Sequence, residues 1–408
     1  MKAIRVGFVG GGFIARFHLR SLVAVRDVCV AGVASPGGGA EFIELAAELG
    51  VAADGGVVAF GDAEELAASD AIDAIWICAR NDTRVIVMKA IERGVQRRSN
   101  PLRGIAVEKP LARTMAEAEE VVRLATSIGA PTAYLEDMLF APSLARGKEV
   151  AWRRGAGVAG RPYLARASEE HSGPHSKWFW QPELAGGGAL IDMMCHSLEA
   201  ARWLLTEPGA ARSSLLPIAV SATTANLKWV HEPYASQLTE RFGADLDWAA
   251  HPSEDFARAT VTWRVAEGPD AGREVISETS SSWCYVGAGL RHEFQLLGPE
   301  YALDIDMART GVEVFMSRNV VGEAGEDLVE KQNAEQGLMP ISPNETAHYG
   351  YEAENRAALA SFRAGRALKP DFAAGLEVTR LLMASYLSAR EGRTVDPFEA
   401  AVSDLQPF

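Results

Sequence analysis

Three residues have the types and spacing of an acid–base site, and the first is a lysine. Lys109 lies in the tripeptide Glu108-Lys109-Pro110, directly after the apolar run 104–107. The proline disfavours helical backbone at the residue before it. We therefore expect the lysine at the carboxyl end of a strand, where open α/β sheets collect their ligands. A Lys-Pro pair taken alone is more often an ordinary turn, so the flanking segments decide between the two interpretations.

The other two residues lie on one predicted helix. Residues 186–188 are three consecutive glycines, and a helical pattern follows them to residue 205. Asp192 and His196 are four residues apart, so they share a helix face. A carboxylate beside an imidazole can orient the ring and stabilise its protonated form, as acid–base catalysis needs. The alternative is a structural polar pair. The glycines favour a site, because they let another segment or a ligand come close.

A cofactor cradle is predicted near the amino terminus. A strand pattern over residues 4–9 precedes a glycine-rich turn, and a helical pattern continues to residue 22. The turn is Gly10-Gly11-Gly12-Phe13-Ile14-Ala15. It matches the dinucleotide-binding pattern G-x-G-x-x-A in the required context, and the first main-chain N–H groups of the helix can bind phosphate. A glycine-rich turn without a ligand is the alternative.

The ends of the next strands supply further candidates for cofactor binding. Ser35 ends the second predicted strand, where an NAD site usually has Asp or Glu. Without a carboxylate nothing repels a 2′-phosphate, yet no arginine follows to bind one, so the sequence predicts NAD or NADP without choosing. Asn81 follows the strand 71–78 and could bind the cofactor, cap the next helix, or both. Glu108 and Lys109 complete this set.

An aromatic loop precedes the glycine triplet. It carries His171, His175, Trp178 and Trp180. Rings with interleaved donors suit a sugar, because C–H faces stack on rings while hydroxyls form hydrogen bonds. A core-packing aromatic cluster is the alternative. A zinc site formed with Asp192 and His196 is disfavoured, because the spacing matches no known pattern, and we predict no metal.

The order of predicted elements indicates two domains. Strands alternate with helices up to about residue 140, which predicts a doubly wound parallel sheet in a domain over residues 1–140. Longer strands with few helices follow, which predicts an α+β domain over residues 141–408 with a mostly antiparallel open sheet. These strands are expected at 163–169, 218–230, 257–263, 273–283, 292–297 and 301–306. Late helices within 351–390 are expected to pack against the sheets, and could return to the first domain.

Composition excludes several classes of partner. The chain has 408 residues, 48% of them hydrophobic, and a formal charge of −14. This charge argues against nucleic acid or an anionic membrane as partner. No apolar stretch is long enough to cross a bilayer and no cleavage-site pattern occurs at the start. The four scattered cysteines form no framework. We expect a cytoplasmic protein.

These motifs together resemble the family of glucose–fructose oxidoreductase and inositol dehydrogenase, the Gfo/Idh/MocA type. The resemblance rests on the order of the glycine turn, Asn81, Glu108-Lys109-Pro110, and Asp192 with His196 after the glycine triplet. It implies a Rossmann domain followed by a domain whose open sheet forms homodimers or homotetramers. It also implies hydride transfer between NAD(P) and a secondary alcohol of a sugar, cyclitol or glycoside.

The resemblance assigns roles to the three residues. It implies that His196, oriented by Asp192, takes the hydroxyl proton, and that Lys109 stabilises the developing alkoxide. Which of His196 and Lys109 is the primary base stays open. The chain departs from the family where Arg84 replaces a frequent histidine and where the connection 96–103 is longer than usual.

Two alternatives of other classes remain. One is a redox-neutral enzyme that oxidises a glycoside transiently, eliminates the glycosidic bond and then returns the hydride. The other is a nicotinamide-binding regulator without catalysis, which would not need Lys109, Asp192 and His196.

Overall fold

The computed structural model describes residues 2–250, 253–287, 289–309, 313–316, 329, 332 and 337–408. Its contacts divide the chain into two compact units. The first unit comprises Met1–Ala141 and Tyr349–Thr379, and the second comprises Pro142–His348 and Arg380–Phe408. Because the late helix over 351–363 falls in the first unit, the first unit is discontinuous in sequence.

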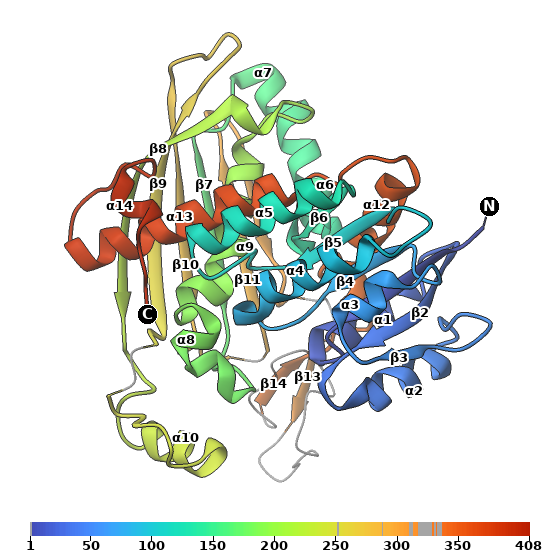
Figure 1. Cartoon of the computed structure of the whole chain (residues 1–408). Helices are drawn as coiled ribbons and strands as arrows, with labels where there is room; N and C mark the ends of the chain where they lie inside the picture. The colour runs from blue at the N-terminus through green and yellow to red at the C-terminus, as the bar shows by residue number, and fades with distance from the viewer. Residues whose placement is uncertain are drawn as a thin grey trace. The chain divides into compact units, whose positions relative to one another are not determined.

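The first unit is built on a six-stranded sheet of order β3-β2-β1-β4-β5-β6, in which every neighbouring pair is parallel (Figure 1). Its strands are β1 (Ile4–Val9), β2 (Val28–Ala34), β3 (Val58–Phe60), β4 (Ala74–Ile77), β5 (Gly104–Glu108) and β6 (Thr132–Leu135). The central strands β4 and β5 are buried throughout, as expected for a sheet that helices cover on both faces. The predicted doubly wound parallel sheet is confirmed.

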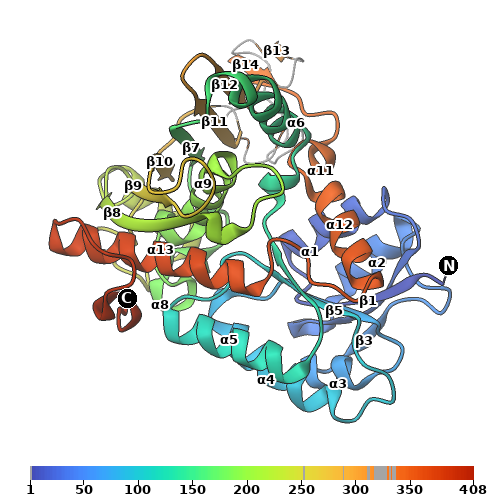
Figure 2. The same cartoon turned by 90° about the horizontal axis from the view of Figure 1, so that it is seen from above.

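The helices of this unit lie on both faces of the sheet (Figure 2). On one face, α3 packs against α4 and α4 against α5; on the other, α1 packs against α2 and α12. Their bounds are α1 (Phe13–Leu22), α2 (Ala40–Glu48), α3 (Ala63–Ala68), α4 (Arg84–Val95), α5 (Met115–Ile128) and α12 (Tyr351–Arg363). The Phe362 ring of α12 fills the space beside Gly104, and it packs edge-on against Trp76, 5.8 Å between centroids. The late helix is therefore part of the core that supports β4 and β5.

The second unit is built on a mixed sheet of order β12-β11-β7-β10-β9-β8. Strands β7 and β10 pair in parallel, and the other neighbours are antiparallel. The strands are β7 (Leu164–Glu170), β8 (Leu215–Ala225), β9 (Phe256–Val265), β10 (Glu274–Ser282), β11 (Arg291–Leu297) and β12 (Ala302–Asp306), with a separate antiparallel pair of β13 (Glu313–Met316) and β14 (Gly337–Pro340). The predicted mostly antiparallel sheet is confirmed.

One long helix, α9 (Ala189–Leu205), packs on β7 and β10. Nearly all its residues are buried, so it is an internal helix with no broad solvent-exposed face. The other helices of the second unit include α6 (Pro142–Val150), α8 (Pro182–Ala185), α10 (Tyr234–Phe242), α11 (Glu345–His348) and α14 (Ala400–Ser403). Helix α13 (Phe372–Glu391) begins in the first unit, and its residues from Arg380 onward belong to the second. Helix α9 thus carries Asp192 and His196 within the body of the unit.

The predicted strand 218–230 is wrong in its second half. Strand β8 ends at Ala225, because the chain there turns toward Asp255. The Asp255 carboxylate accepts the main-chain N–H groups of Leu227, Lys228 and Trp229 at 2.7, 2.8 and 2.9 Å. A carboxylate that binds successive amides competes with strand pairing, and the hydrophobic pattern did not reveal it.

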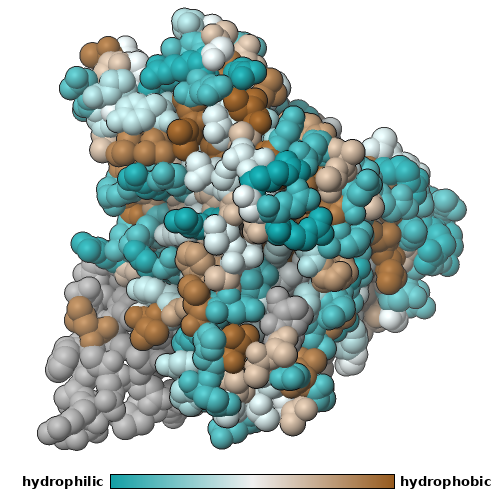
Figure 3. All heavy atoms as spheres, turned by 90° about the vertical axis from the view of Figure 1, so that its left-hand side faces the viewer, coloured by the Kyte–Doolittle hydropathy of each residue, from teal (hydrophilic) through white to brown (hydrophobic). Residues whose placement is uncertain are grey.

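None of the helices in the described part of the chain is long and apolar enough to span a membrane. Figure 3 views the molecule from the left-hand side of Figure 1 and shows hydrophilic and hydrophobic residues intermixed. No large apolar patch dominates that side of the described chain.

Candidate active site

The glycine turn has the shape of a phosphate cradle. Gly10 has φ +98°, and a side chain there would place its Cβ 2.7 Å from the Cys78 carbonyl oxygen, so the fold itself requires glycine at this position. Gly12 differs: its φ is −75°, and an added Cβ would meet no atom within 4 Å. The fold therefore does not require glycine at residue 12. Open space at the start of α1 fits the close approach of a pyrophosphate.

This contrast gives the first prediction. Gly12→Ala should lower the free energy of unfolding by no more than about 1 kcal/mol, the usual cost of alanine at a helix N-cap. It should raise the Kd for NAD by at least about tenfold, because the methyl group would take up the open space in which we expect the phosphates. Calorimetric titration and thermal unfolding measure both quantities.

Gly10→Ala is the matched control, because its added methyl strains the fold directly. It should lower the melting temperature clearly more than Gly12→Ala does. Unchanged NAD affinity in a folded Gly12→Ala protein would contradict the assignment of this turn to the cofactor.

The other cofactor candidates lie at the same edge of the sheet. Ser35 follows β2, and a Cβ added to Gly11 would lie 3.4 Å from its hydroxyl oxygen, so the serine borders the glycine turn. Asn81 follows β4 and is 95% buried, at the start of the turn η2 (Asn81–Thr83). The N-cap of α4 is Thr83, so the prediction that Asn81 caps the next helix is wrong. Its position beside the strand end leaves cofactor binding as its candidate role.

Lys109 is the residue after β5, and a buried hydrogen-bond network fixes the glutamate before it. Glu108 lies 2.7 Å from His18 Nε2, and its second oxygen accepts the Lys109 main-chain N–H at 3.0 Å. The other His18 nitrogen, Nδ1, lies 2.9 Å from the Asn355 amide nitrogen. The glutamate at the end of β5 is thus joined to α1 and α12.

The indole of Trp76 settles the direction of these bonds. Trp76 can only donate, and it meets the Asn355 amide oxygen at 2.9 Å. The Asn355 nitrogen therefore faces His18 and donates to Nδ1. This assigns the single proton of a neutral His18 ring to Nε2, which donates to Glu108.

The network holds Glu108 as a carboxylate. Burial alone would raise the pKa of Glu108, but the His18 hydrogen bond and the nearby charges of Lys109 and Arg84 hold it below its ordinary value. Arg84 is itself buried and donates to the Ile77 carbonyl at 2.8 Å. The arginine that departs from the family pattern therefore places a positive charge close to Glu108.

Sequence reasoning missed His18 and Asn355. His18 lies six residues past Gly12 on α1, and Asn355 comes from a helix 337 residues further along. The sequence offers only a lone histidine on an apolar helix, which is more often a core residue. No local signal marks Asn355.

On α9, Asp192 and His196 are one helical turn apart, as predicted. His196 is 96% buried, and Asp192 is half-buried. The Asp192 carboxylate accepts a hydrogen bond from the indole of Trp283 at 3.2 Å. Trp283 follows strand β10 and was not among the predicted site residues.

The glycine triplet before α9 lets neighbouring segments of the chain pack directly against its backbone. A side chain at Gly187 would collide with the Tyr386 hydroxyl, and one at Gly188 with the backbone of Glu254. The Glu254 carboxylate accepts the N–H groups of Gly188 and Leu190 at 3.1 and 2.9 Å and the Tyr386 hydroxyl at 2.8 Å. Side-chain oxygens that accept the first main-chain N–H groups of a helix stabilise its start. Glu254 is therefore the cap of the helix that carries Asp192 and His196, and neither periodicity nor spacing pointed to it.

This cap should make stability depend on pH. Burial raises the pKa of Glu254 from 4.5 to about 7. As pH rises, the unfolded chain therefore loses this proton first, and the stability contributed by the folded protonated form is lost between about pH 4.5 and 7. In the wild type, this titration should lower the free energy of unfolding by up to about 3 kcal/mol across that window. In Glu254→Gln this decrease should be absent. Urea unfolding at a series of pH values measures it.

Glu240→Gln is the control, because Glu240 is exposed on α10. It should leave the pH dependence as in the wild type. An equal slope in the wild type and in Glu254→Gln would show that Glu254 does not titrate in this range.

The aromatic loop divides into buried and half-buried residues. Trp180 is 98% buried in an aromatic cluster with Trp229, Trp248 and Trp283, which matches the core-packing alternative for that ring. Trp178 is half-buried and stacks on Phe179 with 3.8 Å between centroids.

The two histidines differ in the same way. His171 is buried, and its Nδ1 accepts the Gly173 N–H at 3.0 Å, so it shapes the turn of the loop. His175 is half-buried. Among the described residues, neither His171 nor His175 belongs to a group whose ligand atoms lie close enough together to hold one metal ion. Of the four residues predicted on this loop, His175 and Trp178 are thus the two that stay partly exposed.

Known protein families match both parts of the chain, the one with the glycine turn and the one with Asp192 and His196. Residues 4–134 match the model described as "Oxidoreductase family, NAD-binding Rossmann fold", and residues 153–272 match the Gfo/Idh/MocA C-terminal domain. The rhizopine catabolism protein MocA of Rhizobium meliloti is 28% identical over 240 residues, 58% of this chain and 67% of that protein. The D-xylose 1-dehydrogenase [NADP(+)] of Haloarcula marismortui is 23% identical over 253 residues, 61% of this chain and 64% of that protein. Each alignment thus spans about two thirds of the relative.

Solved structures share the fold over almost the whole chain. GenD2 from gentamicin A biosynthesis, in complex with NAD, has a TM-score of 0.75 at 24% identity, covering 97% of both chains. Levoglucosan dehydrogenase, in complex with NADH and levoglucosan, has a TM-score of 0.70 at 19% identity, covering 98% of this chain and 100% of that one. The two family models together span more than half of the chain. The chain belongs to the Gfo/Idh/MocA family of oxidoreductases, and its first unit carries the NAD-binding Rossmann domain of that family.

Proposed function

We propose that the protein is an NAD(P)-dependent dehydrogenase that transfers hydride between nicotinamide and a secondary alcohol of a sugar, cyclitol or glycoside. The observation that carries the proposal is the position of Lys109. It lies at the carboxyl end of β5, on the sheet edge that also carries the glycine turn, and the buried bond between Glu108 and His18 holds the residue before it. An ammonium group at such an edge is suited to a reacting oxygen.

Each residue has a separate role in the proposed reaction. Bound NAD(P) supplies the hydride acceptor. His196, oriented by Asp192, takes the proton of the substrate hydroxyl. Lys109 donates a hydrogen bond to the oxygen and stabilises its negative charge. Because an imidazole can accept a proton, and a lysine can do so in its neutral amine form, replacing His196 is the experiment that decides which is the primary base.

The substrate class is inferred from the loop and from the relatives. His175 and Trp178 offer a hydrogen-bonding group and a ring that is only half-buried, as carbohydrate recognition needs. The printed names of two related proteins contain D-xylose and levoglucosan, which supports a carbohydrate-like substrate. We infer that residues 1–140 bind the cofactor and residues 141–408 bind the substrate.

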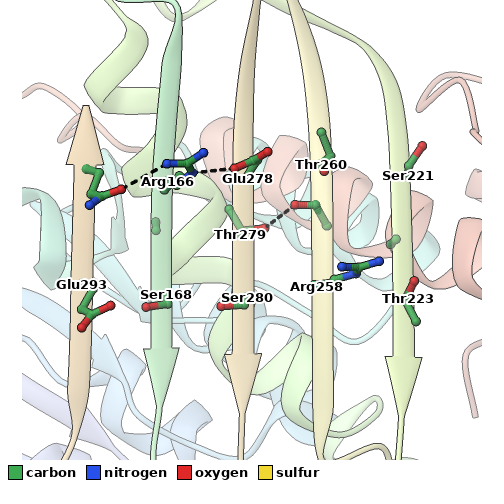
Figure 4. Close-up of a pocket in the computed structure, with 14 residues that line it drawn as sticks. Arg166, Ser168, Ser221, Thr223, Arg258, Thr260, Glu278, Thr279, Ser280 and Glu293 are labelled. Carbon is green, nitrogen blue, oxygen red and sulfur yellow. Dashed lines mark hydrogen bonds and ion pairs between the residues drawn. The ribbon is translucent and has the colours of Figure 1, made fainter. Parts of the chain in front are cut away.

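We also infer a homodimer or homotetramer formed through the open face of the second sheet. Arg166, Arg258, Glu278 and Glu293 project from this face between short serine and threonine side chains (Figure 4). Arg166 pairs with Glu278 at 2.6 Å. A flat face with both signs of charge can match its own copy across a twofold axis. Sedimentation of the intact protein should give two or four times the chain mass, and a single monomeric species would contradict this.

None of the four cysteines, which all lie in the described part of the chain, forms a disulfide, and this supports a reducing compartment and hence our proposal of a cytoplasmic location.

The test of function is anaerobic mixing of the purified protein with NAD, and separately NADP, against a panel of sugars, cyclitols and glycosides. Nicotinamide absorbance and released aglycone are followed together. Stoichiometric cofactor reduction is the expected result, and it identifies both the cofactor and the substrate class. Aglycone release without net reduction would establish the redox-neutral alternative. No signal with any substrate would favour a regulator.

A further inference from the structure

We propose that Trp283 is a positioning residue that sets the orientation of the Asp192 carboxylate. The kinetic part of this inference rests on the proposed function, while the contact itself does not. Trp283 immediately follows β10, is fully buried, and its indole N–H lies 3.2 Å from Asp192 Oδ2. An indole N–H can only donate, so the bond runs from Trp283 to the carboxylate.

Trp283 is itself held from three directions. Its main-chain N–H donates to the Asp255 carbonyl at 2.8 Å. Its own carbonyl accepts the Trp229 indole N–H at 2.7 Å. Its ring meets Trp180 edge-on, with 4.8 Å between centroids and 60° between planes. The position of the Trp283 indole is therefore fixed by main-chain hydrogen bonds and by ring packing. A contact between two exposed side chains would not be held in this way.

The frame around Trp283 is anchored in turn by the Asp255 side chain. Its carboxylate binds the main-chain N–H groups of Leu227, Lys228 and Trp229. This fixes the backbone of Trp229, whose indole then holds the carbonyl of Trp283. These hydrogen bonds thus connect the loop after β8 with the start of β9 and with the residue that follows β10.

A fixed donor at Oδ2 restricts rotation of the carboxylate. Aspartate side chains have several staggered rotamers, and the bond from Trp283 favours those that place Oδ2 of the half-buried Asp192 at the indole. With Oδ2 engaged, the direction of the second oxygen is set relative to α9. His196 lies one turn further on the same face. The Trp283 indole thus fixes the orientation of the Asp192 carboxylate, which in the proposed function orients the His196 imidazole. Supporting hydrogen bonds of this kind keep catalytic side chains in position.

Removing the donor while keeping the ring tests this role in catalysis. Trp283→Phe should lower kcat by about tenfold, since a hydrogen bond to a charged group is lost but water can partly replace it at a half-buried carboxylate. The KM for the cofactor should change less than twofold. In an Asp192→Ala background the same change should have no further effect on kcat, because the group being positioned is gone.

Trp263→Phe is the matched control. Trp263 is equally buried in the same sheet, and its indole donates to the Ser277 hydroxyl at 2.9 Å. Its replacement removes a buried indole bond of the same unit and should leave kcat unchanged. If Trp283→Phe lowers kcat equally in the wild-type and Asp192→Ala backgrounds, the residue acts by another route and the proposal is overturned.

A spectroscopic measurement tests the contact without any turnover. In protein labelled with ¹⁵N-tryptophan, the indole signal that disappears in Trp283→Phe is that of Trp283. This signal should shift upfield in Asp192→Ala, while the signal that disappears in Trp263→Phe should stay in place. An unmoved Trp283 signal would overturn the proposal even in an active enzyme. A moved signal in a protein that turns over no substrate would support the contact and reject only the proposed function.

Discussion

Replacing Lys109 by alanine is expected to lower kcat by about a thousandfold and to change the Kd for NAD by less than about threefold. The large loss follows from the proposed mechanism, in which the ammonium group stabilises charge on the reacting oxygen, an effect that single donors supply at about this size. Cofactor binding is retained because the bond from the Lys109 main-chain N–H to Glu108 does not involve the side chain. The network of Glu108, His18 and Asn355 also stays complete. Steady-state kinetics and calorimetric titration measure the two quantities.

Lys89→Ala is the control for Lys109→Ala. Lys89 lies on α4 in the same unit, is half exposed, and pairs only loosely with Glu120 at 3.6 Å. Its loss should leave both kcat and NAD affinity unchanged. Turnover of Lys109→Ala at the wild-type rate would remove the central claim of the proposed function. Loss of NAD binding together with turnover would instead place the lysine in the cofactor site.

His196→Asn is expected to lower kcat by about a hundredfold to ten-thousandfold, the usual contribution of a positioned general base. Asparagine keeps a polar side chain of similar size in a site that is 96% buried, so the fold should be retained. The profile of kcat/KM against pH should also change shape, because the imidazole no longer accepts a proton. Kinetics over pH 5 to 10 with a thermal unfolding check measure both effects.

The same experiment decides which residue is the primary base. A reduced rate with an unchanged pH profile would mean that another group accepts the proton, and Lys109 would take that role. His231→Asn serves as control, because His231 is exposed on the loop before α10. Its replacement should leave both rate and profile unaltered.

The sequence alone was sufficient for features that depend on local spacing. The glycine turn, the strand that ends at Glu108 and the helix of Asp192 and His196 each follow from residues within about twenty positions of one another. In such segments the periods of helix and strand, with the special freedom of glycine, determine which side chains share a face or an end. The alternation of strands and helices likewise determined the parallel sheet, because short crossovers allow few other arrangements.

Only the tertiary structure decided what holds these residues. Glu108 meets His18, 90 positions earlier; Gly188 meets Glu254, 66 positions later; and Asp192 meets Trp283, 91 positions later. Such contacts depend on how packed elements bring distant segments together, and no periodicity within a segment encodes them. The same reason explains why the predicted strand 218–230 runs past the true end of β8. The Asp255 carboxylate there accepts a main-chain N–H group of the following loop. The sequence thus determined the candidate catalytic groups, and long-range packing decided their hydrogen-bond partners.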